Sequence, residues 1–388
     1  MTELFFYVQH LHGIGHLRRA AAIVRAAAAD GIETLLVSGG FPVPDLDLGG
    51  AAFAQLPPLR TADESFSRLV GEDGEEVSVA FKAARRERLL ALFAEAAPRI
   101  LMTEMFPFGR RQLRFELEPL LAAAETAPAR PWIVSSVRDL LVVQDNPEKS
   151  AWMRDTALAH FDRVIVHGDP SLIAFGESFA HAAELGERLV YSGYVASGGE
   201  TAAAQQPSGE VLVSIGGGAF GASLARCAIA ARPLSALSQA PWRLLLGHNL
   251  PPAVFEALKA GAGGGIAVER ARPDFPALLR ACRLSISQAG YNTAVDLLQA
   301  GTPAVLVPFS GGAETEQAAR AAKLAAAGLA VVLDEAALSP QALAAAVDRA
   351  AALAPARHRL ALDGAAETAG LLRRLCAGTP GQASSKSV

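Results

Sequence analysis

The feature of this sequence that most constrains its fold is an alternation of short apolar runs with longer helical segments. The short runs are apolar throughout, which is typical of parallel strands in a sheet covered on both faces. The longer segments are rich in alanine and arginine and have helical periodicity, so the pattern predicts an α/β protein with parallel sheets. In the first half the predicted strands are Leu4–Gln9, Glu33–Ser38, Ala52–Leu56, Ile100–Thr103, Trp132–Ser136 and Arg163–His167, and the predicted helices span residues 17–29, 75–97, 110–125 and 149–160.

A stretch of linker composition, Ala196–Glu210, divides the chain into two halves of similar size. It is rich in Gly, Ser, Ala and Gln and holds almost no large apolar residue. The predicted strands after it are Val211–Ile215, Arg243–Leu246, Gly265–Val268, Leu284–Ser287, Ala304–Val307 and Ala330–Leu333, with a helix beginning near Ala222. We therefore predict an N-terminal domain over residues 1–195, a C-terminal domain over 209–359, a last helix over 360–376 and a disordered tail over 377–388.

Composition excludes several classes of protein. The chain has 35 Lys and Arg against 39 Asp and Glu, a formal net charge of -4, so no basic excess favours nucleic acid as a partner. No apolar stretch approaches the ~20 residues that a membrane-spanning helix needs. The N-terminus, MTELFFYVQH, has no basic region or small-residue cleavage site, so no signal peptide is expected. Three cysteines without C-x-x-C spacing favour reduced thiols in a cytoplasmic protein over disulfides or a zinc site: Cys227, Cys282 and Cys376.

The first predicted strand runs into a glycine turn, GIGHLRRA, at residues 13–20. Gly13 and Gly15 allow a ligand to approach the backbone, whose exposed N–H groups favour anions. His16 is expected at the N-terminus of a helix, where the helix dipole disfavours imidazolium, so a neutral histidine could act there as a general base. The spacing of the nearby histidines matches no common metal-ligand pattern, and we expect no metal site. The alternative is a tight turn with solvated histidines.

A second glycine turn, Ser214–Ala222, opens the second half in the same position between strand and helix. It lacks the Lys-Ser/Thr of a P-loop, which disfavours an NTP-hydrolysing motor. A phosphate-binding role is favoured by its place at the start of an α/β unit.

The third region follows the strand Leu284–Ser287, where the chain turns through Gln288 and Gly290 into a helix. We expect Asn292 or Thr293 to cap that helix. Asp296, one turn inside it, could accept hydrogen bonds from a diol such as ribose. Two polar residues after the neighbouring strand are expected to face the same crevice: Glu316 and Gln317. The alternative is that all of these are ordinary caps and solvated carboxylates.

The segment SQAGYNTAVDLLQAGTPAVLVPF…ETEQAARAAKLAAAGLA resembles the C-terminal nucleotide-sugar domain of glycosyltransferase family 28, the MurG-like enzymes. The resemblance covers most of residues 209–335 and has the glycine turn, helix acid, Gly-x-Pro strand and glutamine loop in order. It implies a GT-B fold, with two Rossmann-like parallel-sheet domains facing across a cleft and a C-terminal helix that returns to the first domain. It also implies an inverting, metal- and cofactor-free enzyme that moves a hexosyl or N-acetylhexosaminyl group from a nucleotide-diphosphate sugar, a UDP-sugar, to an acceptor hydroxyl.

By position, the resemblance assigns roles to individual residues. It places the ribose on Asp296 and the donor sugar on Gln317, with Glu316 in the neighbouring polar position. It places the diphosphate beside Gly217, Gly218 and Gly221, the base near Arg272, and an active-site role on His16. The chain departs from the family's pattern at Ala219, where a small hydroxyl residue is usual, and at Gln288-Ala289-Gly290, where the family has Arg-Ser-Gly.

Residues 104–109 do not show the family's glycine-rich lipid-acceptor loop, so the acceptor stays open between a glycolipid and a polysaccharide precursor. We expect Glu104 at the rim of the cleft, where it rivals His16 as the catalytic base. Arg110, Arg111 and the pair Arg138-Asp139 could bind hydroxyls or a phosphate of the acceptor. The apolar run at residues 105–108 either contacts a membrane, which would place the protein at its inner face, or packs against a neighbouring helix.

Two other functions are consistent with the sequence. The turn Gly13-x-Gly15-His16-x-x-Arg19 also resembles that of the enzymes that hydrolyse UDP-sugars in pseudaminic-acid synthesis, in which water replaces the acceptor. A nucleotide-sugar-binding protein without turnover is the third alternative, favoured slightly by Ala219.

Overall fold

The computed structural model describes residues 2–11, 13–44, 46–62, 68–142, 146–196, 207–215, 221–248, 250–309, 311, 315–353 and 358–380. The chain forms two compact units. The first unit comprises Met1–Ser197 and Asp363–Val388, and the second comprises Gly198–Leu362.

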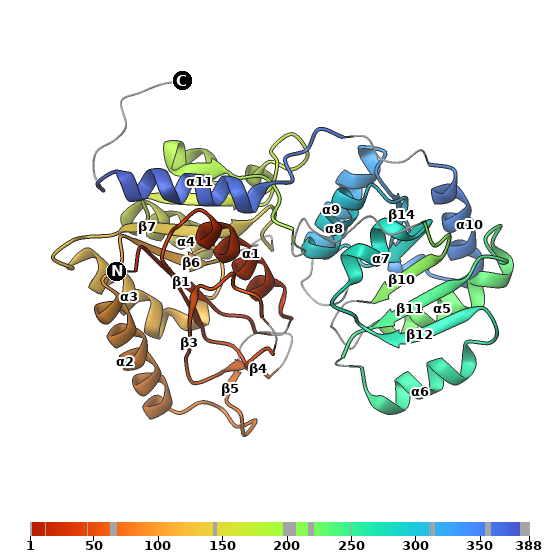
Figure 1. The fold of residues 1–388 in the computed structure, drawn as a ribbon, viewed down its shortest axis with the longest axis horizontal. Helices are drawn as coiled ribbons and strands as arrows, with labels where there is room; N and C mark the ends of the chain where they lie inside the picture. The colour runs from red at the N-terminus through yellow and green to blue at the C-terminus, as the bar shows by residue number, and fades with distance from the viewer. Residues whose placement is uncertain are drawn as a thin grey trace. The chain divides into compact units, whose positions relative to one another are not determined.

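The first unit is built on a parallel sheet with the strand order β3-β2-β1-β6-β7-β8-β9 (Figure 1). Its strands are β1 (Leu4–Val8), β2 (Thr34–Ser38), β3 (Ala52–Gln55), β6 (Ile100–Glu104), β7 (Trp132–Arg138), β8 (Arg163–His167) and β9 (Leu189–Tyr191). The central strand β1 is buried on both faces, which explains its uninterrupted apolar sequence LFFYV. A separate antiparallel pair consists of β4 (Arg60–Thr61) and β5 (Leu69–Val70).

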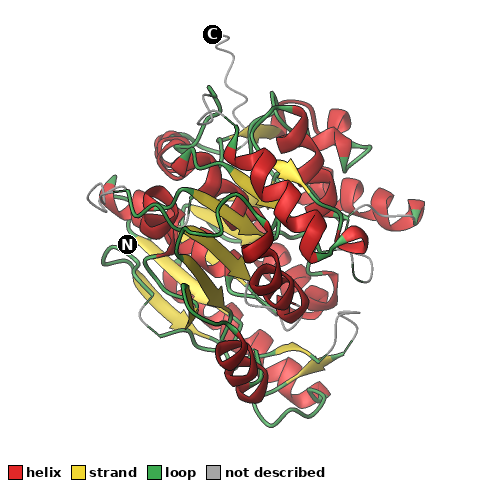
Figure 2. Ribbon diagram, turned by 90° about the vertical axis from the view of Figure 1, so that its right-hand side faces the viewer, coloured by secondary structure: helices red, strands yellow, loops and turns green. Residues whose placement is uncertain are grey.

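Helices cover both faces of this sheet, and Figure 2 shows helices in red beside strands in yellow. They are α1 (Gly15–Ala29), α2 (Val79–Ala96), α3 (Arg114–Glu125), α4 (Pro147–His160) and α11 (Gly364–Ala377), with short 3-10 turns η1 (Arg111–Leu113), η2 (Phe175–Glu177) and η3 (Ala182–Arg188). Local sequence sets two of these helix starts: the side chains of Ser78 and Asn146 cap α2 and α4 by accepting backbone N–H groups. The last helix, α11, packs along α1 (Figure 1). Its Leu372 and Leu375 join the buried core to which α1 also contributes.

The second unit holds a parallel sheet with the order β12-β11-β10-β13-β14-β15. Its strands are β10 (Val211–Ile215), β11 (Trp242–Leu246), β12 (Ile266–Arg270), β13 (Leu284–Ser287), β14 (Ala304–Leu306) and β15 (Val331–Val332). Its helices are α5 (Ala222–Ala231), α6 (Pro252–Gly261), α7 (Phe275–Ala281), α8 (Tyr291–Ala300), α9 (Glu316–Ala326) and α10 (Pro340–Ala351), with turns η5 (Arg232–Leu234) and η6 (Glu335–Ala337). The core lies between the sheet and helices α5 and α10.

Each strand predicted from the sequence is present, within two residues of the predicted ends. The α/β prediction with parallel sheets is therefore confirmed. The strands β4, β5 and β9 were not predicted; each has only two or three residues, too few to give a periodic signal. Most of the predicted linker and of the predicted tail lies outside the described residues.

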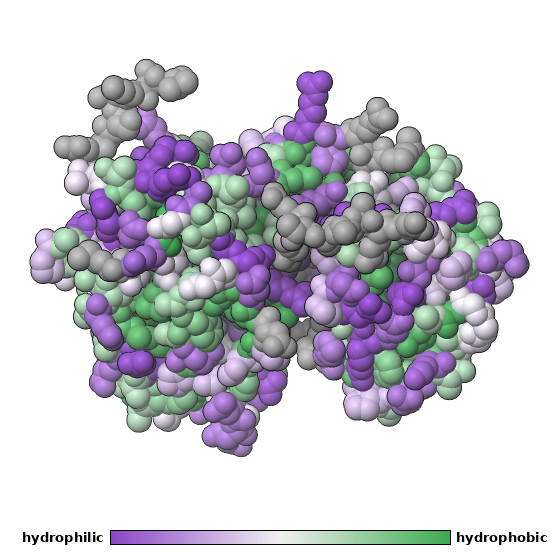
Figure 3. All heavy atoms as spheres, in the orientation of Figure 1, coloured by the Kyte–Doolittle hydropathy of each residue, from purple (hydrophilic) through white to green (hydrophobic). Residues whose placement is uncertain are grey.

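In the described part of the chain, no helix combines the length and apolar character of a membrane span. Hydrophilic and hydrophobic residues are interspersed on the face shown in Figure 3. The apolar run at residues 105–108 is buried: Phe106 packs edge-on against Trp152, and Phe108 against Phe175 and Phe179. Of the two alternatives for this run, packing inside the protein is the one observed.

Candidate functional site

The strand order of the first unit marks where a ligand would bind. Connections from β1 lead to β2 and β3 on one side, whereas β6 and the strands after it lie on the other. The carboxyl ends of β1 and β6 therefore flank a topological switch point, the usual ligand position in such sheets. The glycine turn with His16 follows β1, and Glu104 ends β6, so the fold brings both predicted catalytic residues to this point.

His16 and Glu104 are in direct contact. Nδ1 of His16 lies 2.9 Å from Oε1 of Glu104, and the same oxygen accepts a hydrogen bond from Nη2 of Arg19. His16 and Arg19 are three residues apart in α1, a spacing that places both on one face of the helix. The side chain of His16 is 17% exposed. Among the described residues, none is hydrogen-bonded to its Nε2.

The sequence suggested that Glu104 lies at the rim of a cleft, but the structure places it in the interior. It is the last residue of β6, which extends one residue further than predicted, and its side chain is fully buried at 0% exposure. Burial alone would raise the pKa of its carboxyl, but the charge of Arg19 and hydrogen bonds from His16 and Ser136 outweigh burial and hold the pKa well below its usual range. Glu104 is therefore a carboxylate at neutral pH.

His16 is neutral at the same pH. Burial is the main cause that lowers the pKa of its imidazole, and the nearby charges of Arg110 and Arg19 act in the same direction. The hydrogen bond with Glu104 opposes this shift without cancelling it. Nη2 of Arg19 also lies 3.2 Å from Nδ1, but it donates to Oε1 of Glu104, the stronger acceptor. Because the same carboxylate oxygen, 2.9 Å away, accepts the Nδ1 proton, we assign the tautomer with its lone pair on Nε2, as a general base requires.

Three residues that the sequence analysis did not single out extend this arrangement: Ser136, His167 and Ser192. The hydroxyl of Ser136 donates to Oε2 of Glu104 over 2.7 Å and lies 2.8 Å from Nε2 of His167. Nδ1 of His167 lies 2.8 Å from the hydroxyl of Ser192. All three side chains are buried. The sequence could have indicated Ser136 and His167, because serine and histidine are unusual at the ends of buried, apolar parallel strands.

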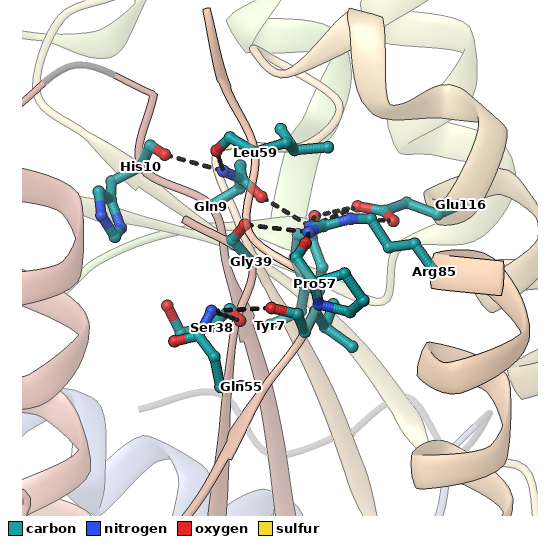
Figure 4. A network of polar contacts seen from close by, with 11 residues as sticks. Tyr7, Gln9, His10, Ser38, Gly39, Gln55, Pro57, Leu59, Arg85 and Glu116 are labelled. Carbon is teal, nitrogen blue, oxygen red and sulfur yellow. Dashed lines mark hydrogen bonds and ion pairs between the residues drawn. The ribbon is translucent and has the colours of Figure 1, made fainter. Parts of the chain in front are cut away.

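A second buried network supports the end of β1 (Figure 4). Arg85 of α2 donates to both carboxylate oxygens of Glu116 of α3, to the side-chain oxygen of Gln9 over 2.7 Å and to the carbonyl of Gly39 over 3.0 Å. Gln9 in turn donates to the carbonyls of His10 and Leu59. This cluster fixes the backbone that leads from β1 into the glycine turn.

The arginines predicted on the acceptor side differ in their surroundings. Arg110 lies next to the site, where its Nε donates to the carbonyl of Gln9 over 2.8 Å; the described residues offer no acceptor to its two terminal nitrogens. Burial and the charge of Arg138 lower its pKa to about 10. Arg111 is instead exposed and lies over the ring of Trp152, at 5.5 Å from its centroid.

The buried histidines predict a pH-dependent stability. Burial is the main cause that lowers the pKa of His10 to about 4 and that of His167 to about 3, below the ~6.5 of an unfolded histidine. The unfolded state therefore binds more protons below pH ~6.5, and the free energy of unfolding falls as the pH drops from there towards 4. Each histidine contributes up to about 1.4 kcal/mol per pH unit.

Urea unfolding at pH 7.5, 6.0 and 5.0 measures this dependence. The variant His167→Gln is expected to lose the contribution of one histidine, so its slope should be shallower than that of the wild type. An identical slope in both proteins would show that His167 titrates alike in the folded and unfolded states.

In the second unit, the strand order places the switch point between β10 and β13. The turn after β13 leads through Gly290 into α8, and a Cβ built on Gly290 would meet no described atom within 4 Å. Its φ is -60°, so the backbone does not require glycine there. The space beside Gly290 is therefore open to a ligand.

The cap of α8 corrects a prediction. Asn292 and Thr293 lie inside the first turn of the helix, and the capping residue is Gly290, with no side-chain cap. Gly290, with an extended backbone, occupies the capping position, and its carbonyl accepts the N–H of Ala294 in the first hydrogen bond of the helix. A helix N-terminus without a side-chain cap presents backbone N–H groups and a positive dipole end, which favour an anion such as a phosphate.

Helix α9 anchors the turn that precedes α8. The side-chain oxygen of Gln317 accepts the N–H groups of Ala289 and Phe309 over 3.1 and 3.2 Å, joining the loops after β13 and β14. Arg320 donates to the carbonyl of Ala289 over 3.0 Å. Ala289 is therefore held through both its backbone groups, which makes the edge of the predicted nucleotide site rigid.

The remaining predicted residues have varied surroundings. Asp296 is 6% exposed in the packed face of α8. Glu316 is the buried first residue of α9 and lies 4.0 Å from Arg320. Arg272 follows β12 and is paired with Asp274 and Glu269.

The predicted glycines fall into three groups. Gly221 is required by packing, since a Cβ there would overlap the side chain of Ile215. Gly13 has open space beside its Cβ position, and Gly15 opens α1. Gly217 and Gly218 lie outside the described residues. Gln288 precedes the anchored turn between β13 and α8.

Sequence comparison finds a family match over most of the second unit. Residues 212–365 match the glycosyltransferase family 28 C-terminal domain. The UDP-N-acetylglucosamine--N-acetylmuramyl-(pentapeptide) pyrophosphoryl-undecaprenol N-acetylglucosamine transferase of Thiobacillus denitrificans is 36% identical over 148 residues, which cover 37% of this chain and 40% of the relative. The enzyme of the same name from Gloeobacter violaceus is 38% identical over 133 residues, which cover 29% and 37%. The chain thus spans less than half the length of these relatives.

Comparison with solved structures covers both units. The MurG of Acinetobacter baumannii aligns with a TM-score of 0.61 at 16% identity, covering 96% of this chain and 99% of that chain. A calicheamicin glycosyltransferase aligns with a TM-score of 0.58 at 17% identity, covering 97% and 94%. Together with the two parallel sheets, this likeness shows the GT-B fold, and that prediction is confirmed.

Proposed function

We propose that this chain, a member of glycosyltransferase family 28 through its second unit, transfers a hexosyl group from a nucleotide-diphosphate sugar to an acceptor hydroxyl. The observation that carries the proposal is the contact of Nδ1 of His16 with the buried carboxylate of Glu104 at the switch point of the first unit. Such a pair activates a hydroxyl nucleophile, and the match of residues 212–365 to family 28 favours a nucleotide-sugar donor.

For the donor, we assign the nucleotide to the second unit. The uncapped N-terminus of α8 and the open space beside Gly290 favour the diphosphate, whose charge increases as the sugar–phosphate bond breaks. Asp296 in the same helix is assigned to the ribose hydroxyls and Gln317, through its amide group, to the sugar. We propose a UDP-sugar, inversion at the anomeric carbon and independence of a metal.

For the base, we assign His16, with Glu104 as the residue that orients it. Both oxygens of Glu104 already accept hydrogen bonds, and the lowered pKa of its carboxyl makes it a weak base. Nε2 of His16 accepts the proton of the acceptor hydroxyl while Glu104 stabilises the imidazolium that forms.

For the acceptor, Arg110 is the residue that favours an anionic group. Its terminal nitrogens have no acceptor among the described residues, and the charge of Arg138 acts on it. A glycolipid or polysaccharide precursor that carries a phosphate or carboxylate fits this chemistry. We propose that the protein binds at the inner face of a membrane, where such an acceptor would be found.

The donor assignment predicts the behaviour of one variant. Replacing Asp296 with alanine is expected to raise the KM for the donor roughly 10- to 100-fold, because hydrogen bonds to two ribose hydroxyls are lost. Initial rates at varied donor concentration and calorimetric titration of the donor measure the effect. Asp334→Ala, which removes an exposed carboxylate from the same unit, should leave the KM within about twofold. Unchanged donor affinity in Asp296→Ala would remove Asp296 from the site.

A nucleotide-sugar hydrolase is the second candidate. It is favoured by Arg19, which follows His16 at the spacing of the hydrolase turn and shares the carboxylate of Glu104 with it. Incubation with UDP-N-acetylglucosamine and no acceptor separates the two functions. A transferase releases UDP and free sugar slowly and accelerates when an acceptor is added, whereas rapid stoichiometric hydrolysis without acceptor establishes the hydrolase.

A further inference from the structure

We propose that Ser136 and His167 are positioning residues for the catalytic base, joined to it in one ordered chain of hydrogen bonds. The chain runs from Ser192 through His167 and Ser136 to Glu104 and ends on His16. It rests on the proposed function, in which His16 removes a proton from the acceptor hydroxyl or from water.

The charge of Glu104 fixes the direction of every proton in this chain. Because the carboxylate carries no proton, the contact of 2.7 Å between Ser136 Oγ and Glu104 Oε2 requires the hydroxyl of Ser136 to donate. The oxygen of Ser136 must then accept from His167, whose Nε2 lies 2.8 Å away. His167 therefore carries its proton on Nε2.

The rest of the chain follows from the neutral state of His167. Burial and the charge of Arg19 lower the pKa of its imidazole to about 3, so only one ring nitrogen carries a proton at neutral pH. Nδ1 is then the unprotonated nitrogen and accepts from the hydroxyl of Ser192 over 2.8 Å, a shorter contact than the 3.3 Å between that hydroxyl and the carbonyl of Gly193. Each of the three buried side chains therefore donates a hydrogen bond in the direction of Glu104. They are Ser136 in β7, His167 in β8 and Ser192 after β9.

The hydrogen bond that Ser136 donates acts on the catalytic base through Glu104. Glu104 divides its charge between Oε1, which faces His16 and Arg19, and Oε2, which accepts from Ser136. The donor on Oε2 keeps the carboxylate in one rotamer and weakens its attraction for the Nδ1 proton of His16. The chain therefore orients His16 and keeps the pKa of its imidazole low. Arg110, Arg19 and Glu104 are the charged groups that act on His16.

Nuclear magnetic resonance of the full chain with 15N-labelled histidine tests the order of protons without requiring activity. The signals of His167 are assigned by their loss in His167→Gln. We expect His167 to be neutral between pH 5.5 and 8, with its proton on Nε2. A proton on Nδ1, or a titration of His167 within that range, would overturn the proposal.

The same spectra report the coupling to His16. In Ser136→Ala the carboxylate loses its donor on Oε2, so the attraction for the imidazolium of His16 strengthens and its pKa is expected to rise above that of the wild type. The matched control is Ser135→Ala, on the same strand, which removes a buried hydroxyl that donates to Phe106 O over 2.7 Å. Equal titration of His16 in both variants and the wild type would contradict the coupling.

Kinetics test the positioning role. Ser136→Ala is expected to lower kcat about tenfold, with the donor KM unchanged, and to move the acidic limb of kcat/KM to higher pH. Ser136→Thr retains the hydroxyl and should restore most of the rate, and Ser135→Ala should stay within about twofold of the wild type. If Ser136→Ala and Ser135→Ala lose activity equally with no movement of the limb, Ser136 has only a structural role.

Different results would overturn the proposed function and the proposed order of protons in the hydrogen-bond chain. If the wild type neither transfers nor hydrolyses any nucleotide-sugar, the proposed function fails while the spectra still decide the order of the chain. If the wild type is active but His167 has the other tautomer, only the chain is overturned.

Discussion

Replacing His16 with alanine is expected to lower kcat by roughly two to four orders of magnitude, the usual contribution of a positioned general base. The imidazole lies after the carboxyl end of β1 and is paired there with the buried carboxylate of Glu104. Because the nucleotide is assigned to the second unit, donor affinity should remain near that of the wild type. Steady-state kinetics and calorimetric titration of the donor measure the two effects separately.

The pH profile of the wild type adds a second test of the base. In the proposed reaction activity needs neutral His16. Burial lowers the pKa of this group below 6.5, so kcat/KM should decline only at a pH below the range of an ordinary histidine. His160→Ala, which alters a histidine of α4 paired with Glu125, is the matched control and should keep the wild-type rate. Retention of more than about a third of kcat in His16→Ala would exclude His16 as the base.

Replacing Glu116 with alanine is expected to lower the free energy of unfolding by roughly 3–5 kcal/mol. The variant leaves the guanidinium of Arg85 buried at 0% exposure without its carboxylate, and the hydroxyl of Tyr7 loses its acceptor. Arg85 also holds Gln9 at the end of β1. The variant should therefore lose activity at temperatures where it is still folded. Urea unfolding monitored by circular dichroism measures the loss of stability.

The control for this prediction lies in the same helix. Glu118 is exposed and forms an ion pair with Arg114 four residues earlier in the sequence, so Glu118→Ala should cost less than about 1 kcal/mol. The double variant Arg85→Met/Glu116→Leu removes both charges and should recover much of the stability. Equal costs for Glu116→Ala and Glu118→Ala would contradict the view that the buried charge makes the difference.

The parallel strands were predictable because each is buried on both faces and reads as one apolar run. Strands β8 and β10 have the predicted bounds, and β1 ends one residue earlier than predicted. The helix cap before α8 was predicted wrongly for a physical reason. Asn and Thr favour caps through their side chains, but the extended backbone of Gly290 already occupies that position.

The interior of the site was only partly predictable. His16 and Glu104 were identified because each ends or follows a predicted strand, but the burial of Glu104 depends on Arg19, which is 85 residues away in the sequence. Ser136 and His167 reach Glu104 only because β6, β7 and β8 are neighbours in the sheet. Strand order of this kind is a tertiary property that a single sequence does not show.

We propose that the second unit binds a nucleotide-diphosphate sugar. The most direct measurement is calorimetric titration of the full chain with UDP-, GDP-, dTDP- and CDP-sugars, repeated with Asp296→Ala. We predict that one nucleotide class, UDP, binds with a one-to-one stoichiometry and that the variant binds it roughly 10- to 100-fold more weakly. Absence of binding by all four classes at millimolar concentration would contradict the account.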